Sequence, residues 1–308
     1  GSAEDLGDVM SISLKDVVKP TFGFQGALQG AGTPNKAGIG GFLPLSVGDN
    51  SVWFVDALIN ANFADREGYS SIINTDVAGT TVSTSTRLGY RWLNSDRSWM
   101  FGLNAGYDSR PMNTGGTDTG INVSGTEKSA FFQQVAVNAE AVANDWNFNA
   151  YALLPVGDTE QDLNVFYQGG ALNTYGLDVG YFITPELNAS VGYYYQNGDL
   201  GTADGSGVLG RMAYEISRGL TVRINISYDE AFETRVSADL EVRFGGANTT
   251  AQRQEVQQLP VINALTSRAS YRDVRVHDVG IGGFGSVEGG GGSDGKEKKV
   301  GFIRSMAS

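Results

Sequence analysis

The stretch "ETRVSADLEVRF", residues 233 to 244, alternates strictly between apolar and polar side chains. In an extended chain, Val236 and Phe244 point to one side, whereas Arg235 and Glu241 point to the other. A period of two residues is that of a β-strand, because helical spacing would mix the two sets. The stretch therefore predicts a strand that separates an apolar environment from an ionic one.

The same alternation recurs along most of the chain and predicts twelve strands of about 10 to 14 residues. They are residues 20–30, 36–47, 51–64, 81–93, 97–110, 130–143, 146–156, 171–183, 186–197, 207–217, 220–229 and 233–244. Strands of soluble proteins average about 5 to 6 residues, whereas a tilted membrane strand needs about 9 to 11. This length favours a transmembrane barrel over a soluble β-sandwich, which alternation alone leaves open.

Two classes of connection alternate between these stretches. Five are tight and polar: 48–50, 94–96, 144–145, 184–185 and 218–219. The others are usually longer, such as 65–80, 111–129 and 157–170. Short turns at one end and long loops at the other are typical of bacterial outer-membrane barrels. We therefore predict an all-β fold, a transmembrane antiparallel β-barrel of about 12 strands with short periplasmic turns and longer extracellular loops.

The composition excludes several other classes of protein. Glycine supplies 43 of the 308 residues, about twice its usual share of ~7%, which disfavours a helical bundle. No run approaches the ~18 consecutive apolar residues of a membrane-spanning helix. The chain has no cysteine and therefore no disulfide or zinc-thiolate site. A net charge of −12 argues against a nucleic-acid partner.

The four tryptophans, Trp53, Trp92, Trp99 and Trp146, each lie within a few residues of a predicted tight turn and on the apolar face. A membrane interface stabilises indole rings at one depth, with the ring among the headgroups and the N–H hydrated. We predict that they form an aromatic girdle at the periplasmic side, in contact with outer-membrane lipid.

An even number of strands places both ends of the barrel at the side of the short turns. We therefore divide the chain into a periplasmic N-terminal segment (1–19), the barrel (20–244) and a tail (245–308). Residues 280–308 are rich in glycine and are expected to be flexible. A twelve-stranded barrel is wide enough for one extended chain, a helix or a small solute. The tail is long enough to thread the lumen over 248–277, or it hangs in the periplasm.

Charged residues of both signs share the polar face and are expected to line the lumen. They are Arg87, Arg91, Asp108, Glu140, Asp178, Arg211, Glu215, Arg223, Arg235, Asp239, Glu241 and Arg243, with Asp56 beside them. The favoured interpretation is pairing across strands that rigidifies the lumen, and the alternative is a selectivity ring for permeating ions. If the tail threads the lumen, Arg253, Arg268, Arg272 and Arg275 are expected beside Asp239, Glu241 and Glu215.

No catalytic constellation is visible in the sequence. The one histidine, His277, follows the last predicted strand, whereas barrel hydrolases generally need a histidine base near the rim. The "GIGGFG" stretch at 280–285 lacks a following helix and is not a nucleotide loop. We therefore expect no enzyme, no metal site and no cofactor.

The sequence resembles one known family. "RLGYRWLNSDRSWMFGLNAGYDSR" (87–110), "VSADLEVRFGG" (236–246) and "LTSRASYRDVRV" (265–276) are similar to the barrel, the last strand and the linker of inverse autotransporters, the intimin and invasin family. This resemblance implies a barrel that translocates its own C-terminal segment to the cell surface. It also implies insertion by the barrel-assembly machinery, and an adhesin whose passenger binds a host or surface receptor. The alternative is a small-solute pore or a structural barrel with a periplasmic tail.

Overall fold

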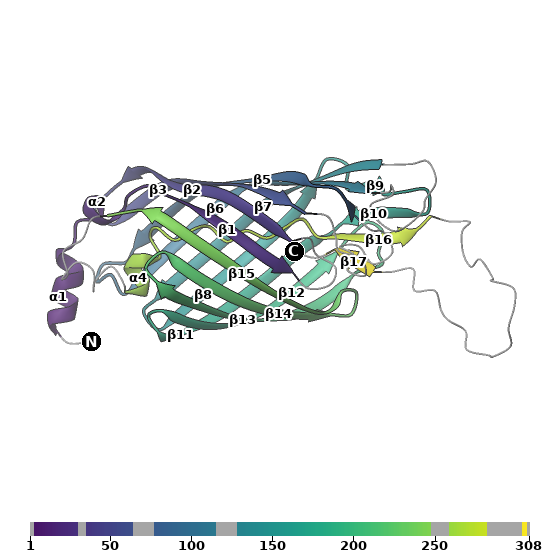
Figure 1. The fold of residues 1–308 in the computed structure, drawn as a ribbon. Helices are drawn as coiled ribbons and strands as arrows, with labels where there is room; N and C mark the ends of the chain where they lie inside the picture. The colour runs from purple at the N-terminus through teal and green to yellow at the C-terminus, as the bar shows by residue number, and fades with distance from the viewer. Residues whose placement is uncertain are drawn as a thin grey trace, which may run out of the picture.

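The computed structural model describes residues 3–29, 35–63, 77–114, 128–247, 259–281 and 304–306. Within this part, twelve long strands form the barrel (Figure 1). They are β1 (Thr21–Gln29), β2 (Lys36–Val47), β3 (Ser51–Asn62), β5 (Thr81–Leu93), β6 (Trp99–Thr114), β7 (Lys128–Ala143), β8 (Trp146–Val156), β11 (Asn173–Thr184), β12 (Leu187–Asn197), β13 (Gly205–Ser217), β14 (Leu220–Asp229) and β15 (Glu233–Gly245).

Each barrel strand pairs in antiparallel fashion with the strands before and after it, and β1 pairs with β15 to close the ring. The short strand β4 (Val77–Ala78) adds to the end of β6. The predicted twelve-stranded antiparallel barrel is therefore confirmed. Strand bounds agree within two residues with the predicted ones, except that β6 continues four residues further, to Thr114.

The alternation of the sequence places apolar side chains outside and polar ones inside the barrel. Outward residues such as Leu28, Val191 and Phe22 are 60 to 69% exposed. Inward residues such as Asp56 and Arg87 are at most 1% exposed. An apolar outer band around a polar interior is the pattern of a barrel that lies in lipid.

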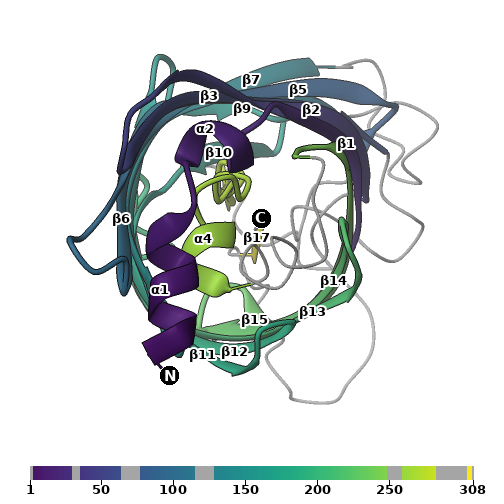
Figure 2. The ribbon, with the colours of Figure 1, turned by 90° about the vertical axis from the view of Figure 1, so that its left-hand side faces the viewer.

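The two ends of the barrel differ. The short turns lie at one end, here called the short-turn end, together with α1 (Ala3–Ser11), α2 (Leu14–Val17) and α4 (Pro260–Asn263) (Figure 1). Viewed from that end, α1 crosses the mouth and α4 lies within the ring (Figure 2). No helix in the described ranges is long and apolar enough to cross a membrane.

A second, smaller sheet lies at the opposite, long-loop end. It contains β9 (Glu160–Asp162), β10 (Tyr167–Ala171), β16 (Val276–Gly280) and β17 (Arg304–Met306). The connection 157–170, expected as one of the longer loops, contains β9 and most of β10. In the structure, β10 pairs with β16, which follows the segment that runs through the barrel.

Candidate functional site: the occupied lumen

Residues 259 to 281, here called the lumen segment, run inside the barrel from the short-turn end to the long-loop end (Figures 1 and 2). The segment begins with α4, whose Val261 N–H donates to Asn144 Oδ1 in a short turn (3.2 Å). It then continues as extended chain and ends in β16. The region of the predicted threading stretch before residue 259, including Arg253, lies outside the described residues.

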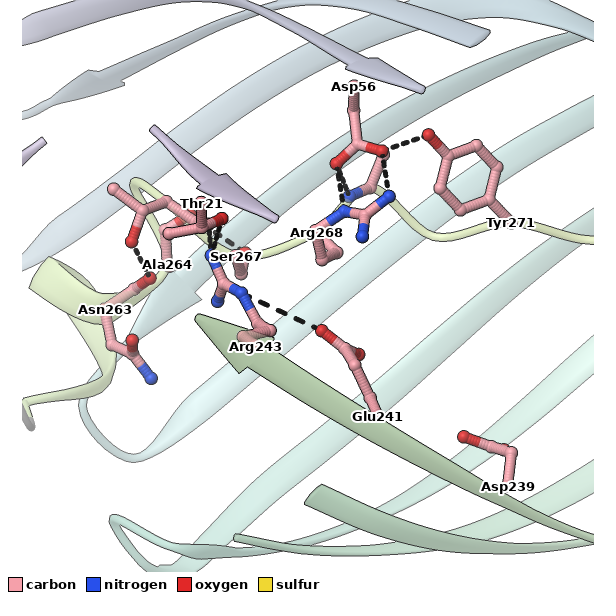
Figure 3. A network of polar contacts seen from close by, with 12 residues as sticks. Thr21, Asp56, Asp239, Glu241, Arg243, Asn263, Ala264, Ser267, Arg268 and Tyr271 are labelled. Carbon is pink, nitrogen blue, oxygen red and sulfur yellow. Dashed lines mark hydrogen bonds and ion pairs between the residues drawn. The ribbon is translucent and has the colours of Figure 1, made fainter. Parts of the chain in front are cut away.

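The first anchor of the lumen segment is Asp56 on β3, which is 0% exposed (Figure 3). Arg268 donates two hydrogen bonds to its carboxylate, from Nε to Oδ2 and from Nη2 to Oδ1, each at 2.7 Å. The Ala269 N–H and the Tyr271 hydroxyl donate to the same carboxylate. A bidentate arginine pair with two further donors satisfies a buried carboxylate almost completely.

Close approach at this anchor requires a glycine on the neighbouring strand. A Cβ atom at Gly40 of β2 would lie 2.6 Å from Arg268 Nη2 and 2.5 Å from the Ala57 carbonyl oxygen. Both contacts are closer than carbon normally approaches polar atoms. The glycine at position 40 therefore makes room for the Arg268 side chain.

Two further arginines bind other parts of the wall. Arg272 Nη2 donates to Asp178 on β11, and its guanidinium carbon lies 3.7 Å from the centroid of the Tyr151 ring. Arg275 Nη2 donates to Asp229 at the end of β14 (3.2 Å) and stacks over Phe232 (4.3 Å). Ion pairs combined with cation–π contacts are stronger away from bulk water than at a surface.

The wall also satisfies the backbone of the lumen segment. Arg91 on β5 donates to the Ser267 carbonyl (2.7 Å), and Arg110 on β6 donates to the Val274 carbonyl (2.8 Å). Gln134 on β7 donates to the Arg272 carbonyl (2.7 Å). An extended chain without strand partners would otherwise bury unpaired carbonyl groups, which is costly.

The remaining predicted lumen residues bind one another or line the wall. Arg87 forms a bidentate pair with Asp108 (2.9 Å for both bonds), and Arg91 binds Glu140 (2.5 Å). Arg223 binds both Asp239 (2.9 Å) and Glu241 (2.8 Å). Arg211 donates to Asn225 (2.6 Å), and Arg235 donates to the Phe232 carbonyl (3.4 Å). Arg243 donates to Thr21 (3.0 Å) and lies 3.9 Å from Glu241. Glu215 lies half-buried on the inward face of β13.

The ion pairs of Arg268, Arg272 and Arg275 are with other carboxylates than the expected Asp239, Glu241 and Glu215. Asp239 lies directly opposite Arg223 in the β14–β15 register, and Glu241 lies one inward position further. Arg223 therefore binds both carboxylates from the adjacent strand, where pairing requires no long-range contact. The lumen segment instead binds acids on β3, β11 and β14.

The short-turn mouth is covered by the N-terminal helices. Val9, Leu14 and Val17 pack in one apolar cluster with Ile262 and Leu265 of the lumen segment. Arg97, in the turn between β5 and β6, donates to the carbonyls of Val9 (2.9 Å) and Ile12 (2.6 Å). That the N-terminal helices cover the mouth was not predicted from the sequence, although the apolar residues Val9, Leu14 and Val17 indicate a buried face.

Three of the predicted girdle residues, Trp53, Trp92 and Trp99, form a connected row of rings with Tyr90, Phe101 and Phe148 at the short-turn end. Trp53 contacts Tyr90 (4.7 Å between centroids), Tyr90 contacts Trp92 (5.3 Å), and Trp99 contacts Phe148 (6.2 Å). Trp146 contacts Tyr181 on β11 (4.9 Å), and about half of its surface is exposed. The row faces outward, where lipid headgroups would meet the indoles.

A cavity of about 260 Å³ remains in the lumen beside the segment. The barrel strands form one wall, which includes Arg211, Arg223 and Asp239 of β13 to β15 and Asn60 of β3. The other wall is the stretch Arg268–Arg275 of the lumen segment. The segment therefore occupies one side of the lumen and leaves polar space on the other.

Comparisons with known proteins support the fold. No family model matches the sequence, and no curated protein matches it either. A structure solved in a study of in-meso crystallization of membrane proteins aligns with a TM-score of 0.57 and 12% identity, over 83% of this chain and 98% of its own. An outer membrane channel from Pseudomonas putida F1 aligns with a TM-score of 0.49 and 11% identity, over 74% of this chain and 96% of its own. The chain is a bacterial outer-membrane β-barrel protein.

The expectation that an outer-membrane barrel of this kind is not an enzyme is wrong. The outer membrane phospholipase from Salmonella typhi is similar in fold, with a TM-score of 0.37 and 12% identity over 78% of this chain and 96% of its own. At this identity the likeness concerns the fold alone. The expectation also assumed no histidine near the rim, yet His277 lies in β16 at the long-loop end, with Nδ1 2.9 Å from Thr202 Oγ1.

Proposed function

We propose that this outer-membrane barrel holds its own C-terminal segment in the lumen and leads it toward the cell surface. The observation that carries the proposal is the set of three ion pairs between Arg268, Arg272 and Arg275 and three separate parts of the wall. Successive arginines are four and three residues apart, about 13 and 10 Å in an extended chain. The pairs thus fix the segment along much of the barrel rather than at one end.

The direction of the segment supports the same function. In outer-membrane barrels the short turns face the periplasm and the long loops face outward. The lumen segment starts beside the short turns in α4 and ends beside the long loops in β16. The described part of the segment thus ends at the long-loop end, and display of the residues that follow is what the resemblance to inverse autotransporters implies. A surface receptor and the barrel-assembly machinery are the partners of this proposal.

Surface labelling on intact cells tests the direction. The chain has no cysteine, so a single Ser293→Cys substitution gives one site for a membrane-impermeant maleimide. We expect labelling without breaching the outer membrane. The matched control, Asp145→Cys in the tight turn between β7 and β8, should label only after breaching. Labelling of Cys at position 293 only after breaching would contradict outward passage.

A small-solute pore is the second candidate, favoured by the polar cavity beside the segment. Channels are among the proteins with a similar fold. Under this function, the full chain in a planar bilayer should conduct ions steadily with the lumen segment in place. Under the first function, the full chain should conduct little.

A further inference from the structure

The cavity beside the lumen segment exposes one arginine whose charge no carboxylate neutralises directly. Arg211 on β13 donates from Nε to Asn225 Oδ1 at 2.6 Å. Among the residues that the structure describes, its two Nη atoms have no hydrogen-bond partner, and no carboxylate oxygen lies within 4 Å of them. Arg211 lines the cavity, so these N–H groups have access to it.

The charged groups around Arg211 do not supply the negative charge that its guanidinium group lacks. The two acids whose charges act on Arg211, Asp178 and Asp239, already bind Arg272 and Arg223, respectively. Both of those guanidinium groups also act on Arg211 and repel it. A cation within a protein lumen is costly without an opposite charge. The position therefore favours a bound anion.

The chemistry of the site limits the class of anion. A guanidinium edge with two free nitrogens binds planar or tetrahedral oxyanions with two parallel hydrogen bonds, as in pairs with carboxylate and phosphate. Asn60 and Ser227 also line the cavity and supply further polar groups. The volume of about 260 Å³ corresponds to roughly eight water molecules at ~30 Å³ each. A small organic acid or a phosphate fits together with water.

We propose that this cavity binds a small oxyanion, a carboxylate or a phosphate group, through the Nη atoms of Arg211. The site requires the barrel wall and the lumen segment, but it does not require that the segment be exported. It therefore stands or fails independently of the proposed function. A simple halide cannot form the bidentate pair, which separates this proposal from general attraction of anions.

Binding of inorganic phosphate to the full chain in detergent tests the proposal. Isothermal titration calorimetry at low chloride should give saturable binding that weakens at least tenfold in Arg211→Gln. The matched control is Arg218→Gln, which removes one positive charge in the turn after β13 and does not line the cavity. We expect phosphate affinity within a factor of two of the unsubstituted chain for this control. Acetate in place of phosphate shows whether a carboxylate suffices.

Arg211→Lys provides the second variant. This substitution keeps the positive charge but removes the pair of Nη groups that would bind two oxygens at once. Phosphate affinity should therefore fall, whereas the attraction of chloride should persist. Folding of each variant is checked by the different gel migration of unheated and boiled protein. If Arg211→Gln does not fold, the lysine variant decides alone. Phosphate and acetate that both fail to bind, or phosphate binding that Arg211→Gln and Arg211→Lys leave unchanged, would overturn the proposal.

Discussion

At the scale of the residue, Asp56 is the side chain on which the lumen segment depends most. It accepts hydrogen bonds from Arg268, Ala269 and Tyr271 and is fully buried. Asp56→Asn would leave the Arg268 charge without its counter-ion, and breaking one side of a buried pair costs about 3–5 kcal/mol. We expect hydrogen exchange of the lumen segment to accelerate by about two to four orders of magnitude, measured by mass spectrometry.

The control for this substitution is Glu215→Gln, which changes an inward carboxylate on β13 that binds no residue of the lumen segment among those described. Hydrogen exchange of the lumen segment should remain unchanged in that variant. The double variant Asp56→Asn, Arg268→Gln removes both charges and should recover part of the protection. Equal exchange in Asp56→Asn and in the unsubstituted chain would show that the ion pair does not hold the segment.

At the scale of the element, the N-terminal helices close the short-turn mouth over α4. Arg97 connects them to the barrel through the Val9 and Ile12 carbonyls and through Asn50. Arg97→Gln removes these bonds, each worth about 1.5–3 kcal/mol when the donor is charged. Exchange should accelerate in α1, α2 and α4 but not in β16. If α1 and α2 remain as protected as before, the apolar cluster alone holds the cover.

The elements also show how far a sequence of this kind can be interpreted. The twelve strands follow from alternation, since an outward residue must face lipid and an inward one must not. The alternation does not show which carboxylate pairs with each arginine of the tail. Asp56, Glu215 and Asp239 look equivalent in the sequence, and only strand tilt and the height of each residue in the lumen separate them. The pairing of β10 with β16 also depends on contacts between residues about 110 positions apart.

At the scale of the whole molecule, the lumen of the barrel is occupied by a segment of its own chain. The wall supplies carboxylates to the arginines of the lumen segment and donors to its carbonyl groups. The apolar clusters at the two ends, formed with α4 and with β16, bury the segment where the ion pairs end. Such a lumen should conduct ions poorly, although the barrel itself is wide enough for a pore.

The most direct test compares single-channel conductance of the full chain with that of a chain ending at residue 258, both folded in planar bilayers. The barrel strands are complete in both, so any difference reports on the lumen segment. We predict low conductance for the full chain and a much larger, steady conductance for the shortened one. Asp56→Asn should lie between them, with frequent transient openings. Equal conductance of the full and shortened chains would contradict an occupied lumen.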